Sequence, residues 1–392
     1  MITIDYETAY AKDFTLSKMT VEEYVRDPRF EIIGVSIKRD DLPGVWYPRD
    51  EVQDALDHHK LHEEEVLAHN AMFDGFILNE VNNIRPGFWL DTLSMARALH
   101  GTTVGNSLAR LAKHYRLPDK GDEIVAALGK WYDDFSPAEL AAYGNYCCHD
   151  GYLAYALFGI FMERKGFPKA ELVSIDQTIR MFTEPMIRLD RSLLDNHLMA
   201  ERVRKEEILH TVLGGAPTEE KLTELRSNQQ FASKLKELGV SPPTKISKTT
   251  GKVTYAFAKT DEGMQALLEH PSDAVAMLVA ARLGVKSSIE ETRAERFIGV
   301  SERGPLPIDL NYYGAHTGRY SAGSKMNIQN LPSRSGSNAL RNSLLAPEGY
   351  VFVSADSSQI EARLLAWLAG QRDLVLAFGA GRDVYCEFAG EV

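Results

Sequence analysis

Hydrophobic and polar residues alternate at the very start of the chain, where residues 1–7 show the period of two that is typical of a β-strand. The pattern predicts a second strand over residues 31–38 and a short third strand over residues 66–69. Helices are expected from about Phe73 and from about Asn106. This mixture of strands and helices predicts an α/β (α+β) domain in the first part of the chain.

A clear helix start lies at Ser136-Pro-Ala-Glu139, which combines an N-cap serine, a proline at the first helical position and the glutamate of a capping box. The helix is expected to continue through Asp150. Residues 166–300 show mostly helical periodicity, interrupted at glycine and proline pairs, and residues 245–255 are predicted to form an exposed basic loop or hairpin.

The last part of the chain, residues 301–392, returns to strand patterns. The run at residues 351–355 is apolar and β-branched, so it predicts a buried strand that ends at Asp356. A helix is expected to follow from Ser358 to Leu368, because its apolar residues repeat on one face. The residues of this face are Ile360, Leu364, Leu365 and Leu368.

Composition narrows the class of protein. A length of 392 residues suggests two or three domains, and 44% hydrophobic with 25% charged residues is ordinary for a globular protein. The net charge of −11 excludes a simple basic nucleic-acid coat but leaves room for a local basic groove. Three cysteines give no disulfide framework, and no apolar run or signal peptide is present, so a cytoplasmic protein without membrane contact is expected.

Acidic residues recur in three places that strand and helix geometry would bring to defined faces. Asp5 and Glu7 lie on the same face of the first strand, Asp74 lies near the start of a helix, and Tyr146 stacks on Asp150 at a spacing of four. Taken singly, these are more commonly a solvated strand face, a helix cap, and a core tyrosine beside a surface aspartate. Because all three occur in this order along one chain, a common functional site is favoured over three separate structural roles.

This order of motifs resembles the three exonuclease motifs of the 3′–5′ proofreading family, in the type that carries tyrosine in the third motif. The resemblance implies a ribonuclease H-like exonuclease domain over residues 1–165. It also implies two Mg²⁺ or Mn²⁺ ions, a water oriented by Tyr146, and a DNA strand end positioned by Asn70 and Phe73. The ions would be held by four carboxylates: Asp5, Glu7, Asp74 and Asp150. Cleavage of a phosphodiester by two metal ions requires such convergent oxygen ligands.

A second group of motifs follows in Thr317-Gly-Arg-Tyr-Ser321, residues 327–332 and residues 356–363. Singly they would be a glycine turn, a polar loop and a capped strand-to-helix junction. Together they closely resemble the palm of family A DNA polymerases, as in bacterial DNA polymerase I and its phage relatives. The resemblance implies that residues 166–300 are a helical, thumb-like region and that residues 301–392 are a partial polymerase palm.

The palm resemblance assigns roles to single residues. Asp356 and the carbonyl of Ser357 would bind the catalytic metal ions, and Glu361 would be the steric gate that selects deoxyribose in the incoming dNTP. Contacts to primer–template DNA are implied for Arg319, Asn327, Gln329, Asn330 and Arg341.

The same family also has a fingers helix with a lysine and a His-Asp-Glu motif, neither of which follows Asp356 in this sequence. We therefore expect that the chain does not polymerise alone. Three explanations remain open: a split gene whose second polypeptide carries these elements, a truncated chain, or a palm remnant that only binds DNA. No 5′-nuclease domain is expected before Asp5, an organisation that resembles compact phage replicases. A phage-encoded protein would be located in the host cytoplasm.

Three functions are compared. The favoured one is a DNA-directed DNA polymerase fragment of DNA replication that has a metal-dependent 3′–5′ proofreading exonuclease and binds single-stranded and primer–template DNA. The alternative is a stand-alone 3′–5′ exonuclease with a DNA-binding palm remnant, but such an enzyme has no need of residues 356–363. A non-catalytic DNA-binding module has no reason to carry four metal-spaced carboxylates.

Overall fold

The computed structural model of the chain describes residues 1–101, 103–120, 127–247, 251–286, 289–323, 327–331 and 338–391. The chain forms two compact units that meet in sequence between Leu345 and Ala346. The first unit contains all of the larger sheets and hydrophobic cores that are described below. Among the described residues, none of the helices is both long and apolar enough to cross a membrane.

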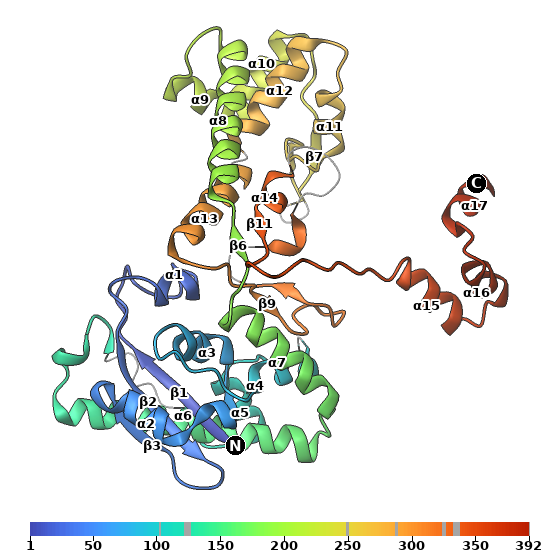
Figure 1. The fold of residues 1–392 in the computed structure, drawn as a ribbon. Helices are drawn as coiled ribbons and strands as arrows, with labels where there is room; N and C mark the ends of the chain where they lie inside the picture. Colours follow the sequence, from blue (N-terminus) through green and yellow to red (C-terminus); the bar gives the residue numbers. More distant parts are fainter. Residues whose placement is uncertain are drawn as a thin grey trace. The chain divides into compact units, whose positions relative to one another are not determined.

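Five strands form the main sheet of the first unit, in the order β3-β2-β1-β4-β5 (Figure 1). β2 pairs antiparallel with both β1 and β3, whereas β1, β4 and β5 are parallel to one another. The strands predicted from the alternating pattern are confirmed, because each overlaps β1, β2 or β4. Their bounds are β1 Ile2–Thr8, β2 Ile32–Arg39, β3 Val45–Pro48, β4 Glu65–Ala68 and β5 Phe88–Asp91.

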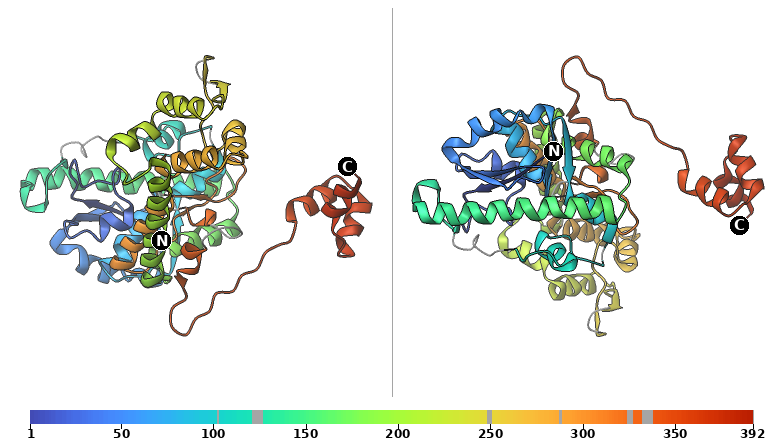
Figure 2. Two further views of the ribbon diagram at one scale, coloured as in Figure 1. Left: turned by 90° about the horizontal axis from the view of Figure 1, so that it is seen from above. Right: turned by 90° about the horizontal axis from the view of Figure 1, so that it is seen from below.

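The long helix α6, Pro137–Gly159, begins at the predicted capping box: the Ser136 hydroxyl accepts a hydrogen bond from the backbone N–H of Glu139. It runs beyond Asp150 and ends in a π-helical turn at Ile160–Arg164. α6 packs against β1, β2 and β3, and it crosses the strands of the sheet in the view from below (Figure 2). This packing fixes the side chains of α6 relative to those of β1.

Other helices complete the layers around the sheet. α3 packs against β1, β4 and β5, and α7 packs against α3 and β5. The core between them contains Ile2, Phe76, Trp89 and Ile179, each with at most 1% of its surface exposed. The helices of this part are α1 Val21–Val25, α2 Val52–His59, α3 Ala71–Glu80, α4 Thr92–His100, α5 Leu108–Tyr115 and α7 Lys169–Thr183.

A second core lies among the helices between Arg191 and Arg303. Arg282 is fully buried there against the rings of Phe231 and Phe257, 4.3 and 4.9 Å from their centroids. Its guanidinium donates to the carbonyl of Ser227, and burial lowers its pKa to about 10. The helices are α8 Arg191–Leu213, α9 Glu219–Arg226, α10 Asn228–Glu237, α11 Glu262–Leu268, α12 Asp273–Lys286 and α13 Ile289–Arg303.

The predicted hairpin is confirmed in its described part, since β7 (Thr244–Ile246) pairs antiparallel with β8 (Val253–Tyr255). The rest of the first unit contributes only short elements. Two antiparallel pairs join β9 with β10 and β6 with β11. The bounds are β6 Arg188–Leu189, β9 Leu310–Asn311, β10 Ser321–Ala322, β11 Leu344–Leu345, the 3₁₀ helix η6 Ile328–Asn330 and α14 Ala339–Asn342.

The unit that begins at Ala346 consists of three helices, α15 Ile360–Leu368, α16 Arg372–Gly379 and α17 Val384–Glu391. The helix predicted from Ser358 is confirmed, but the buried strand predicted over residues 351–355 is wrong. Val351 and Val353 are 82% and 88% exposed, and no described strand pairs with this segment. An apolar, β-branched run forms a strand only where a neighbouring strand supplies the hydrogen bonds of the ladder.

The close contact between α6 and the sheet yields a stability prediction. A Cβ atom on Gly144 would lie 2.4 Å from Cγ of Trp46, whose ring also packs against Gly34 and therefore has no free space to move into. We expect Gly144→Ala to destabilise the protein by about 1–3 kcal/mol. The matched control is Gly159→Ala at the end of the same helix, where a Cβ meets nothing within 4 Å. This control should be neutral or stabilising by about 0.5–1 kcal/mol. Thermal unfolding of both variants tests this prediction. Equal melting temperatures of Gly144→Ala and Gly159→Ala would contradict the close packing of Trp46 against Gly144.

Candidate functional site

Four carboxylates that are far apart in the sequence lie in one pocket of about 440 Å³, built by β1, α3 and α6. Tyr146 also lines this pocket. The structure thus brings together every residue of the three acidic sequence motifs. The residues of these motifs that the sequence singled out and that line the wall are Asp5, Glu7, Asn70, Phe73, Asp74, Tyr146 and Asp150.

β1 supplies the first two carboxylates. Asp5 and Glu7 are two residues apart on the strand, so their side chains point to the same face of the sheet. A carboxylate oxygen of Asp5, a carboxylate oxygen of Glu7 and the Sγ atom of Cys147 on α6 all lie within 4.8 Å of one another. The Cys147 thiol donates to the backbone carbonyl of Asp5 at 3.1 Å, which ties the helix to the strand at this point.

α3 supplies the third carboxylate through its first turn. The backbone N–H of Tyr6 donates to Asp74 Oδ1 at 3.0 Å, so the carboxylate is bound to β1 itself. Asn70 precedes α3 with φ 77°, a left-handed conformation that asparagine tolerates better than most residues. Its backbone N–H donates to Asp91 at 2.8 Å, and the same Asp91 caps α4. Asp91 therefore fixes the turn that leads into the site.

α6 supplies Tyr146 and the fourth carboxylate, and Ser36 of β2 holds the helix by donating to the carbonyl of Cys147 at 3.2 Å. The two oxygens of Asp150 differ. Oδ2 accepts a hydrogen bond from Nζ of Lys120, whereas Oδ1 is buried and has no hydrogen-bond partner in the part of the chain that the structure describes.

Burial of several acids in one place disfavours their charged forms. Burial raises the pKa of Asp5 well above its usual range, and the charges of Asp74, Glu7 and Asp150 add to this shift. Burial likewise raises the pKa of Glu7 to about 8 and that of Asp74 to about 7. Burial also raises the pKa of the Tyr146 hydroxyl, with the Asp150 charge adding to it.

The donor set of this pocket fits a divalent metal ion of the Mg²⁺ type. All four acids offer oxygen, the ligand that hard cations prefer, and the buried Oδ1 of Asp150 lacks a partner. A dication would remove the electrostatic cost that raises the pKa values, since it favours the ionised carboxylates.

Sequence reasoning missed several residues of this pocket. Tyr143 lies one turn before Tyr146 on α6, with the two rings stacked 6.2 Å apart, and this spacing was a readable signal. Lys120 on the wall gave no such signal, and neither did Asp91, which is not on the wall but holds the turn at Asn70. Lys120 lies in an irregular segment, and the role of Asp91 depends on where the turn at Asn70 folds.

A second, shallow pocket of about 550 Å³ gathers four of the five residues of the first unit for which the sequence predicts DNA contacts. Its wall includes Arg319, Asn327, Gln329 and Asn330. Arg341 lies in α14 and is not part of this wall. The remaining polymerase candidates belong to the other unit, where Asp356, Ser357 and Glu361 are exposed at or just before the start of α15.

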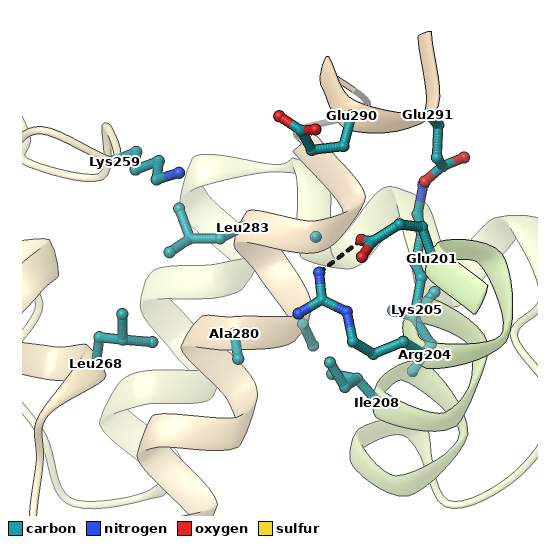
Figure 3. A pocket seen from close by; sticks show the side chains of 13 residues that line it. Glu201, Arg204, Lys205, Ile208, Lys259, Leu268, Ala280, Leu283, Glu290 and Glu291 are labelled. Atoms are coloured by element: carbon teal, nitrogen blue, oxygen red, sulfur yellow. Dashed lines mark hydrogen bonds and ion pairs between the residues drawn. The ribbon is translucent and has the colours of Figure 1, made fainter. Parts of the chain in front are cut away.

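The third pocket lies between α8, α12 and α13 and shows a different charge arrangement (Figure 3). Two of its cations are each paired with a separate acid, Arg204 with Glu201 at 2.7 Å and Lys205 with Glu291 at 2.7 Å, and Lys259 also lines the wall. The pocket walls also contain apolar side chains such as Ile208 and Leu283. Because acids and cations are mixed on its wall, and the acids form no metal-type cluster among the described residues, this pocket does not have the convergent acids that a metal centre needs.

Comparisons with known proteins place the second half of the chain in a family. Residues 200–392 match the model of DNA polymerase family A. The chain is 29% identical over 342 residues to DNA polymerase I of Synechocystis sp., a match that covers 81% of this chain and 32% of that protein. It is 40% identical over 87 residues to the thermostable DNA polymerase I of Thermus aquaticus, which covers 22% of this chain and 10% of that protein. Residues 200–392 therefore match a family A DNA polymerase domain, and the chain is similar to bacterial DNA polymerases I.

A solved structure shares the fold. The chain superposes with a TM-score of 0.61 on the POL domain of Pol1 from M. smegmatis, which was solved in complex with DNA primer-template and dNTP. The sequence identity is 20%, and the match covers 91% of this chain and 59% of that one. The chain spans about a third or less of the length of the curated relatives named above.

The raised pKa values predict how stability depends on pH in the metal-free protein. A carboxyl group whose pKa is higher in the folded than in the unfolded state contributes stability at low pH and loses it as the pH rises through the folded value. For Glu7 and Asp74 this window runs from about pH 4 to about pH 8.

We expect the melting temperature of the metal-free protein to fall across this window by less in Glu7→Gln than in the wild type. Excess Mg²⁺ should raise the wild-type melting temperature more at about pH 8 than at about pH 5. Identical pH profiles of wild type and Glu7→Gln would refute this.

Proposed function

We propose that the acidic pocket is the active site of a metal-dependent 3′–5′ exonuclease in a ribonuclease H-like domain. One observation carries the proposal: the acids of all three sequence motifs, together with Tyr146, line a single pocket. The mixed five-stranded sheet supports it as well, because its central strand β1 carries two of the acids.

In this proposal Asp5, Glu7, Asp74 and Asp150 hold two Mg²⁺ or Mn²⁺ ions, which would supply an activated water and stabilise the leaving oxygen. Tyr146 orients the water from α6. Asn70 and Phe73, at the turn into α3, position the end of a single DNA strand. The protein's part is to hold the carboxylates convergent and largely shielded from bulk water.

The test is degradation of a 5′-labelled single-stranded oligonucleotide with Mg²⁺. We expect wild-type chain to shorten it from the 3′ end and the double variant Asp5→Ala with Glu7→Ala to lose about a thousandfold or more, which is about 4 kcal/mol of transition-state stabilisation. Asp54→Ala, an exposed acid on α2, should retain full activity. If the double variant still degrades the oligonucleotide, the acidic pocket is not the active site.

We further propose that the family A domain contributes to DNA-directed DNA polymerisation in DNA replication. The shallow pocket with Arg319, Asn327, Gln329 and Asn330 would contact the primer–template, because arginine and amide side chains suit phosphates and minor-groove acceptors. Arg341 would add a phosphate contact from α14. In the other unit, Asp356 and the carbonyl of Ser357 would bind the catalytic ions and Glu361 would exclude a ribose 2′-OH from the dNTP site.

Nucleotide addition would also need polypeptide beyond these residues, such as a second chain that carries the fingers and a His-Asp-Glu motif. The support is the surface of the three terminal helices, where large apolar side chains face solvent. Leu365, Leu368 and Phe388 are 68%, 74% and 66% exposed, and exposed apolar side chains in such number favour a contact site. Asp356 is likewise exposed on an irregular segment rather than held at a strand end.

The corresponding test is primer extension. The purified chain alone is expected to add no nucleotides to a primer–template, whereas addition of a polypeptide with a family A fingers domain and His-Asp-Glu motif should produce extension. Asp356→Asn should abolish that extension without changing 3′–5′ degradation, since it lies outside the acidic pocket. Extension by the chain alone would overturn the need for a partner. Continued absence of extension with the partner would favour the stand-alone exonuclease.

A further inference from the structure

A single lysine lies among the acids of the proposed exonuclease site. Lys120 is the one lysine or arginine on the described wall of the acidic pocket, and its ammonium donates to Oδ2 of Asp150. The same Nζ lies 5.0 Å from the ring centroid of Tyr146. The lysine side chain is 27% exposed, whereas that of Asp150 is 5% exposed. The ammonium therefore reaches from the pocket rim to a buried carboxylate.

The position of this ammonium conflicts with metal binding by the same carboxylate. A carboxylate oxygen that accepts a charge-assisted hydrogen bond from lysine does not at the same time offer that lone pair to a metal ion. Two positive charges at the same oxygen also repel each other strongly in a poorly solvated pocket. A dication that binds the Asp150 carboxylate is therefore repelled by the ammonium, and its binding favours displacement of the ammonium.

We propose that Lys120 is a built-in competitor of the divalent cation: its ammonium occupies the Asp150 carboxylate in the metal-free protein and is displaced when the metal binds. This inference rests on the proposed exonuclease site. It makes Lys120 a positioning residue that neutralises part of the acid cluster before metal arrives, and it sets the metal concentration at which the site becomes loaded.

The chain offers a closely matched control. Lys130 has a side chain that is 30% exposed, forms an ion pair with Glu139, and lies 5.3 Å from the ring centroid of Phe135. It thus repeats the carboxylate and aromatic contacts of Lys120, but it is not part of the acidic pocket. A change that is specific to the pocket should appear at Lys120 and be absent at Lys130.

The experiment measures Mn²⁺ binding to the full chain by calorimetry, without DNA, in wild type, Lys120→Met, Lys120→Arg and Lys130→Met. Methionine keeps most of the aliphatic stem and removes the charge. We expect Lys120→Met to bind Mn²⁺ about tenfold more tightly than the wild type, because one competing charge is removed. Lys120→Arg and Lys130→Met should bind with the wild-type affinity. The metal-free Lys120→Met should also melt at a lower temperature than the wild type, and excess Mn²⁺ should abolish this difference.

The outcomes separate the two proposals. If the wild type binds Mn²⁺ no more tightly than the double variant Asp5→Ala with Glu7→Ala, the metal site itself, and with it the proposed function, fails. If wild-type binding depends on those acids but Lys120→Met binds with unchanged or weaker affinity, only the competitor role of Lys120 fails. Circular dichroism of each variant shows that the comparison is made between folded proteins.

Discussion

The structure of the site depends on one electrostatic constraint: four acids of like charge are held together in a pocket largely withdrawn from water. Such an arrangement is unfavourable by itself, since burial and mutual repulsion both oppose ionisation. The fold holds the acids there with fixed contacts. The backbone N–H of Tyr6 donates to the carboxylate of Asp74. On α6, the carbonyl of Cys147 accepts a hydrogen bond from the Ser36 hydroxyl, and the Cys147 thiol donates to the carbonyl of Asp5. The packing of Trp46 against Gly144 sets the height of α6 above the sheet.

The order of the strands explains why residues so far apart in sequence meet. β1 lies in the middle of the sheet, between β2 and β4, so the helix that follows β4 and the helix that packs across β1 to β3 both reach its side chains. Three separate segments therefore contribute to one pocket, and none of them contains the site alone. A shift of any one of these elements would separate the acids.

Local patterns in the sequence were sufficient for the parts of the site that local geometry determines. The spacing of Asp5 and Glu7 fixes their common strand face, and the capping box at Ser136 fixes where α6 begins. Long-range contacts were not readable in this way. Lys120 lies in an irregular segment, so its approach to Asp150 depends on tertiary structure alone. The strand expected at residues 351–355 failed for the same reason, because a strand requires a partner strand that the apolar run does not specify.

The two candidate chemistries of the chain therefore differ in what assembles them. The acidic pocket is complete within one unit, because β1, α3 and α6 share a hydrophobic core and are bound to one another by hydrogen bonds. The polymerase candidates are divided between two units, and Asp356 lies exposed next to helices whose apolar side chains face solvent. In the proposed complex, further polypeptide would cover those apolar side chains. The acidic pocket thus depends on contacts within this chain, whereas the proposed nucleotide addition would depend on contacts between the exposed apolar side chains of α15–α17 and further polypeptide.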